Sequence, residues 1–271
     1  MDGDTRATNL PRWETTRLWT CLEGTSTSEA EAVRTTLKQC MPGIEAVLSK
    51  GGTAPTDFTL HDADHSFRVA QRMADIVPSD VLTKLSAYEI ALLLLAAYVH
   101  DIGMTPEQRR VRDHYHYLLT GTENGLTDAE LAIFQKWIDD QNRELSVPLC
   151  PTAPTRDQLN LAEELITHYC RNRHNDWSGD WIGQNLAGRS LGSYSGWIDD
   201  LLVLCKSHHM GYHELKGPRF DPRYVGSPPC VVHLRYLACV LRIADVLDID
   251  PERTPDVILR HRAVAPASFI Y

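Results

Sequence analysis

The most strongly apolar part of the chain is segment 86–104. Between residues 90 and 99 no charged or amide side chain interrupts it, so a helix formed there is expected to be buried on every face. Ser86 and Glu89 have the S-x-x-E spacing of a capping box, which predicts that the helix begins at this serine. Gly103 is expected to end the helix by adopting a left-handed conformation. The rest of the chain is expected to be organised around this helix.

Apolar residues recur at helical spacing in several other segments, and these predict the remaining helices. The expected helices cover residues 13–19, 29–38, 61–77, 128–141, 155 to a Gly/Ser-rich loop at 179–196, 198–209 and 231–248. Met41-Pro42-Gly43 and Pro78 are expected to end the second and third of them. Hardly any segment alternates between apolar and polar residues as a strand does. The pattern therefore predicts an all-α fold, a helical bundle with a central buried helix.

The chain divides by composition into an N-terminal helical extension, residues 1–54, and a main domain, residues 55–271. Within the main domain, residues 105–154 are charged and broken by glycine and proline, which is typical of an insertion. A lid over a functional site and a plain surface excursion are two interpretations of such an insertion. For the extension, we expect packing or a surface for a second copy or another partner.

The 271 residues are 43% hydrophobic and 23% charged, which is ordinary for a soluble globular protein. A formal net charge of −9 argues against non-specific binding to duplex nucleic acid or to an anionic membrane. The seven cysteines contain no C-x-x-C pair, which is typical of a reducing compartment. The longest apolar run has about half of the roughly 20 residues that a membrane span needs. With no signal peptide at its start, the chain is expected to be cytoplasmic.

Five imidazole and carboxylate side chains lie where predicted helices turn inward, on four separate helices. They are His65, His100, Asp101, His208 and Asp245. Each alone is best explained as a hydrogen-bonded buried residue, but five together are hard to satisfy with one another. Nitrogen and oxygen ligands without a thiolate suit a divalent ion, namely Mn, Fe, Ni, Co, Mg or Zn. The set therefore predicts a metal centre, with one to three ions.

Four motifs occur in an order that resembles a known family. They are H-x-x-R-V at 65–69, H-D-I-G at 100–103, H-H at 208–209 and R-I-A-D at 242–245. Together they are similar to the HD superfamily of metal-dependent phosphohydrolases, over roughly residues 55–255. The segments 58–69 and 171–178 most resemble bacterial HD proteins that are sometimes joined to an Hsp90-like ATPase domain. The G-Y-P signature of cyclic-di-GMP phosphodiesterases and the H-D-x-x-E-D of alarmone hydrolases are absent.

This resemblance implies a set of metal ligands. The residues that would hold the first ion are His65, His100, Asp101 and Asp245. Asp101 would also bridge to a second ion bound by His174 and His208. His61 and His209 resemble the extra ligands of subfamilies with richer metal centres. His168 is the alternative to His174, and the family match favours His174.

The resemblance further implies a phosphohydrolase that acts on a nucleotide or related phosphoester. A metal-bound hydroxide would attack phosphorus in line, with His100 and Asp101 as the catalytic pair and Asp101 orienting the nucleophile. The cations expected to neutralise the phosphate are Arg68, Arg171, Arg173 and Lys206. Two other functions stay open: a phosphodiesterase for cyclic nucleotides or oligonucleotides, and a non-catalytic nucleotide-sensing module. Choice of substrate is expected to rest on the insertion and on the Gly/Ser-rich loop.

Overall fold

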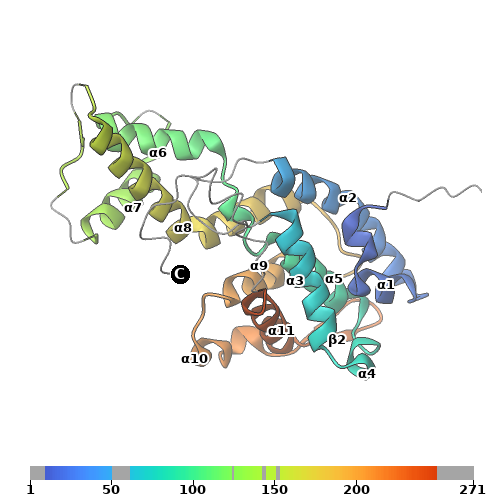
Figure 1. Ribbon diagram of the computed structural model, residues 1–271. Coiled ribbons are helices and arrows are strands. Elements are labelled where there is room, and N and C mark those ends of the chain that lie inside the picture. The colour runs from blue at the N-terminus through green and yellow to red at the C-terminus, as the bar shows by residue number, and fades with distance from the viewer. Residues whose placement is uncertain (1–9, 51–61, 124, 142–144, 151–152, 249–271) are drawn as a thin grey trace, which may run out of the picture. The chain divides into compact units, whose positions relative to one another are not determined.

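The computed structural model describes residues 10–50, 62–123, 125–141, 145–150 and 153–248 (Figure 1). The chain forms two compact units. Among the described residues, the first unit contains residues 10–45, 63–100 and 182–248, and the second contains residues 46–50, 62, 101–123, 125–141, 145–150 and 153–181. His61, one of the predicted metal ligands, lies outside the described residues.

Helices dominate both units, so the predicted all-α fold is confirmed. The elements that begin in the first unit are a 3-10 helix Arg12–Thr15, α1 (Arg17–Glu23), α2 (Ser28–Lys50), α3 (Ala63–Ile76), α4 (Ser79–Leu82), α5 (Ala87–Val99), α9 (Trp197–Ser207), α10 (Tyr212–Leu215), a 3-10 helix Pro218–Phe220, β1 (Arg223–Val225), β2 (Cys230–Val232) and α11 (Leu234–Val246). Those that begin in the second unit are a 3-10 helix Ile102–Met104, α6 (Gln108–Thr120), α7 (Asp128–Asp139) and α8 (Arg156–Leu186).

Helix α5 is the centre of the first unit, and every one of its residues is buried, as predicted. It packs against α1, α3, α9 and α11. Its start is fixed by the predicted capping box, in which the Ser86 hydroxyl accepts from the Glu89 amide and the Glu89 carboxylate accepts from the Ser86 amide. The stretch Ala87–Thr120 is the one described segment long and apolar enough to cross a membrane, but its apolar window is wholly buried, as in a core helix.

The N-terminal helices differ from the prediction at Pro42. Helix α2 does not break there but continues to Lys50 with the proline inside it. Proline in a helix interior costs about 3 kcal/mol, so the helix needs a compensating gain. Met41 and Ile44, on either side of Pro42 and Gly43, are fully buried, and burial of such side chains contributes about 1.5–3 kcal/mol each. Packing therefore outweighs the local preference.

Two further boundaries were predicted wrongly. Helix α8 does not stop at Gly179 but runs on to Leu186, so the Gly/Ser-rich loop is confined to residues 187–196. Ile182 and Leu186 are buried, which offsets the roughly 0.5–1 kcal/mol that a glycine costs within a helix. The predicted helix 231–248 begins only at Leu234, because residues 230–232 pair as strand β2 with β1 in an antiparallel hairpin that the sequence pattern did not reveal.

The second unit has a core of its own, built from α6, α7 and the first part of α8. His114 lies among aromatic rings there, with centroid distances of 4.9 Å to Phe134 and 5.0 Å to Tyr169. Its Nδ1 donates to the carbonyl of Arg110, 2.8 Å away. Both helices of the predicted insertion, α6 and α7, thus contribute to a packed core. The role of the insertion as a lid stays a prediction.

Candidate metal centre

The central helix ends at His100, which is buried and forms the C-terminal cap of α5. Its Nδ1 is 3.1 Å from the carbonyl oxygen of Ala96 and 3.2 Å from that of Ala97. Because a carbonyl oxygen only accepts, Nδ1 carries the proton in the neutral ring. The lone pair of the imidazole is therefore on Nε2.

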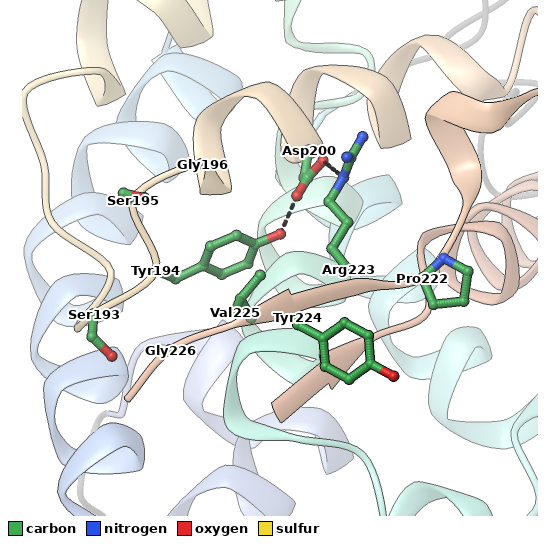
Figure 2. A pocket seen from close by; sticks show the side chains of 10 residues that line it. All are labelled: Ser193, Tyr194, Ser195, Gly196, Asp200, Pro222, Arg223, Tyr224, Val225 and Gly226. Carbon is green, nitrogen blue, oxygen red and sulfur yellow. Dashed lines mark hydrogen bonds and ion pairs between the residues drawn. The ribbon is translucent and has the colours of Figure 1, made fainter. Parts of the chain in front are cut away.

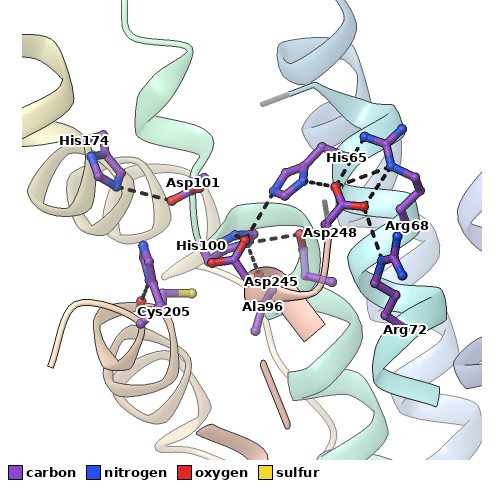
Figure 3. A network of polar contacts seen from close by, with 12 residues as sticks. His65, Arg68, Arg72, Ala96, His100, Asp101, His174, Cys205, Asp245 and Asp248 are labelled. Atoms are coloured by element: carbon purple, nitrogen blue, oxygen red, sulfur yellow. Dashed lines mark hydrogen bonds and ion pairs between the residues drawn. The ribbon is translucent and has the colours of Figure 1, made fainter. Parts of the chain in front are cut away.

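His65 on α3 and Asp245 on α11 come together with His100 within the first unit (Figure 3). One oxygen of Asp245, Oδ1, is 3.7 Å from Nε2 of His65 and 3.6 Å from Nε2 of His100. The ligand atoms of the three residues all lie within 4.8 Å of one another. Both histidines are buried, whereas the Asp245 side chain is partly exposed.

The spacing of these three groups fits a shared cation better than direct bonding. Separations of 3.6 and 3.7 Å are too long for hydrogen bonds, which are about 2.7–3.2 Å. Two ligand atoms about 2.1 Å from a tetrahedral ion would be about 3.4 Å apart. His65 and His100 both direct Nε2 toward the same carboxylate oxygen. Each imidazole nitrogen then faces an oxygen that is also a hydrogen-bond acceptor, unless a proton or a metal ion lies between them. A divalent ion satisfies all three groups at once.

His208 lies beside this group at the end of α9, where it forms the C-terminal cap. Its ring meets that of His100 edge to face, with centroids 5.3 Å apart. Its Nδ1 bonds to the carbonyl of Cys205, which again leaves the lone pair on Nε2. His209 is exposed, with its ring centroid 4.1 Å from that of His208.

Asp101, the residue after His100, belongs to the second unit, where its partner is His174 on α8. Asp101 Oδ1 is 3.3 Å from His174 Nε2, and both side chains are nearly buried (Figure 3). The Nδ1 of His174 bonds to the carbonyl of Arg171, so this imidazole also presents Nε2 as an acceptor. His168, the alternative ligand on the same helix, is exposed.

Gly103 explains how α8 approaches Asp101. The prediction that this glycine adopts a left-handed conformation is wrong, because it is not among the described glycines with positive φ. Instead, a Cβ at this position would lie 2.0 Å from the carbonyl oxygen of His174 and 2.7 Å from the amide of Ser178. The Gly103 amide donates to the Ser178 hydroxyl, 2.9 Å away. Glycine is needed here for close backbone contact, which brings His174 to the turn after His100.

The cations predicted to bind substrate are held in different ways. Arg68 on α3 directs Nε onto Asp248 at 3.0 Å, and Arg173 on α8 pairs with Asp176 at 2.7 Å. Arg171 is exposed on α8. Lys206 is half-buried in the last turn of α9.

Asp248 and Arg72 are two polar residues of this region that the sequence pattern did not assign to the site. Asp248 accepts hydrogen bonds from His65 Nδ1 at 2.7 Å, from Arg68 and from Arg72 Nε at 3.3 Å (Figure 3). Burial by itself would raise the pKa of the Asp248 carboxyl, but hydrogen bonds from His65 and Arg68 hold that pKa well below its ordinary value. Two spacings could have revealed the group: Asp248 follows Asp245 by three positions, and Arg72 follows Arg68 by four.

The Gly/Ser-rich loop borders an open pocket of 610 Å³ in the first unit (Figure 2). In its lining, the buried carboxylate of Asp200 accepts hydrogen bonds from the hydroxyl of Tyr194 and, at 2.6 Å, from Nε of Arg223. The loop is also tied down by Ser193, whose hydroxyl accepts from the Ser227 amide at 2.8 Å. None of the histidines or acids predicted as metal ligands lines this pocket.

Comparison with known protein families gives one match. The family model HD-CE matches residues 56–271, which is most of the chain and includes every predicted metal ligand. No curated protein and no solved structure matches the chain.

Proposed function

Because the chain belongs to the HD-CE family, we propose that it is a metal-dependent phosphohydrolase that hydrolyses a nucleotide or a related phosphoester. The observation that carries the proposal is the convergence of His65, His100 and Asp245, with two imidazole Nε2 atoms 3.6 and 3.7 Å from one carboxylate oxygen. Such a set of nitrogen and oxygen donors is typical of a hydrolytic divalent-metal site.

His65, His100 and Asp245 would hold the first ion, with Asp101 as the fourth ligand because it follows His100 directly in the chain. A bound divalent ion lowers the pKa of water and polarises a phosphoryl oxygen. For a second ion, Asp101 and His174 supply an oxygen and a nitrogen 3.3 Å apart. His208 is proposed as a further ligand on the chemistry of its Nε2 alone.

The protein's own groups would orient the reactants. The backbone carbonyls of α5 hold the His100 ring, which keeps the lone pair of Nε2 directed at Asp245. As an ionised carboxylate, Asp101 would accept a hydrogen bond from the attacking water and orient it toward phosphorus. Arg171, Arg173 and Lys206 remain the proposed partners of the substrate phosphate.

A hydrolysis assay tests this function. Protein purified without chelator is incubated with Mn²⁺ or Ni²⁺ and a panel of nucleoside mono-, di- and triphosphates, cyclic nucleotides, short oligonucleotides and an aryl phosphodiester. We expect turnover that EDTA abolishes and that His100→Ala lowers by more than about 100-fold, since even outer partners of metal ligands contribute 10–100-fold. His213→Ala, which removes an exposed histidine of the same unit, should leave the rate unchanged.

The same assay separates the proposed function from its alternatives. Turnover restricted to cyclic nucleotides, oligonucleotides or the aryl diester identifies a phosphodiesterase. Nucleotide and metal binding without any turnover identifies a sensing module. Equal rates for His100→Ala and wild type would contradict the proposed site even if hydrolysis is seen.

A further inference from the structure

The carboxylate of Asp248 is more deeply buried than the other charged groups around His65, which are Asp245, Arg68 and Arg72. It follows α11 directly and its side chain has no exposed surface. Three side chains of α3 contact it: Nδ1 of His65 at 2.7 Å, Nε of Arg68 at 3.0 Å and Nε of Arg72 at 3.3 Å (Figure 3). A buried carboxylate is stable only when such partners compensate its lost hydration.

His65 consequently lies between two carboxylates of one chain segment. Asp248 contacts its Nδ1, while Asp245, three residues earlier, lies 3.7 Å from its Nε2. An ionised carboxylate only accepts, so the Nδ1 proton is fixed on the Asp248 side and the lone pair on the Asp245 side. The two acids thus face opposite ends of the same imidazole.

This arrangement distinguishes His65 from the other histidines of the region. His100 and His208 direct Nδ1 to neutral backbone carbonyls, whereas His65 directs it to a full negative charge. A charged acceptor makes the opposite nitrogen a more basic ligand and locks the orientation of the ring.

Asp248 also neutralises positive charge beside the site. Arg68 and Arg72 lie one turn apart on α3, the helix that carries His65. Both are at most about one third exposed, so solvent screens their charges incompletely. Without the carboxylate, the positive charges of the two guanidinium groups would lose this compensation and would repel a cation bound by His65 more strongly.

We propose that Asp248 is a positioning residue that fixes the tautomer and orientation of His65 as a metal ligand and shields the bound cation from Arg68 and Arg72. This inference rests on the proposed function, because it requires a metal ion at Nε2 of His65. In this role Asp248 would act through His65, without touching the ion or the substrate.

Binding of Mn²⁺ to metal-free protein, measured by titration calorimetry, tests the inference. Asp248→Asn keeps an acceptor for Nδ1 but removes the charge, and Asp248→Ala removes both. We expect the dissociation constant to rise about 10-fold for the asparagine variant and about 100-fold for the alanine variant, the range found for outer partners of metal ligands.

Asp200→Asn is the matched control, because Asp200 is also a buried carboxylate of the first unit that is ion-paired to an arginine. Its affinity for Mn²⁺ should stay within about 2-fold of the wild type, since it contacts none of the proposed ligands. Wild-type affinity in Asp248→Asn and Asp248→Ala would overturn the inference alone. Absence of Mn²⁺ binding by the wild type would instead overturn the proposed function, and the inference with it.

The wild-type protein provides a test that does not depend on the folding of a variant. Nitrogen-15 NMR of histidine-labelled protein reports which ring nitrogen of each histidine carries the proton, and comparison with His65→Gln assigns the His65 signals. We expect the Nδ1–H tautomer for His65 in metal-free protein at neutral pH. An Nε2–H tautomer would refute the role of Asp248.

Discussion

Replacing Gly103 with alanine should separate α8 from the turn after the central helix. The added Cβ would lie 2.0 Å from the carbonyl oxygen of His174, 1.4 Å closer than the 3.4 Å at which ordinary contacts begin. The clash is with backbone atoms, so no side chain can relieve it by rotating. Overpacking typically costs about 1–3 kcal/mol, and loss of the Gly103–Ser178 hydrogen bond adds about 1 kcal/mol. We therefore expect a destabilisation of about 3 kcal/mol.

Thermal unfolding followed by circular dichroism measures this effect. A loss of about 3 kcal/mol should lower Tm by roughly 6–12 °C in a protein of this size. The control is Gly183→Ala on the same helix, where the new Cβ has no neighbour within 4 Å. That variant should gain about 0.5–1 kcal/mol, because alanine restricts the unfolded chain. A Gly103→Ala protein as stable as the wild type would refute the close approach of the two backbones.

Two further predictions concern histidines of the second unit. Burial lowers the pKa of His114 from its ordinary value of 6.5. The imidazole therefore binds a proton more readily in the unfolded chain than in the folded one. The stability of the second unit should consequently fall as the pH drops below 6.5. In His114→Phe, chemical denaturation at pH 7.5 and 5.5 should show a smaller pH dependence than in the wild type, and an unchanged dependence would contradict this assignment. His174→Ala should lower both the rate of hydrolysis and the bound metal, because His174 faces Asp101, whereas His168→Ala should change neither. The reverse order in a steady-state assay with metal analysis would show that His168 is the ligand.

The parts of the fold that sequence predicted well are those in which local and tertiary signals agree. The capping box of Ser86 and Glu89 fixed the start of α5, and the uninterrupted apolar run of residues 90–99 matches its complete burial. Pro42 and Gly179 show the opposite case, because each disfavours a helix locally while buried residues further along keep the helix continuous. Local preference cannot reveal such compensation, which depends on distant packing partners.

The same distinction applies to the candidate site. The spacing of His65, His100 and Asp245 on helical faces was sufficient to expect them together. Asp248 escaped assignment because its role depends on α3 residues about 180 positions earlier in the chain. Gly103 was assigned the wrong role because a glycine after a helix usually indicates a left-handed turn, and the approach of α8 is not encoded nearby. Contacts between distant segments are what the local pattern lacks.

The most direct test of the metal centre is a crystal structure with anomalous data collected at the absorption edge of the bound metal. We expect a peak bonded to Nε2 of His65, Nε2 of His100 and Oδ1 of Asp245, and the loss of this peak in crystals of Asp245→Ala. Direct hydrogen bonds of about 2.7–3.2 Å between the histidines and Asp245, with no anomalous peak after soaking in Mn²⁺, would contradict it.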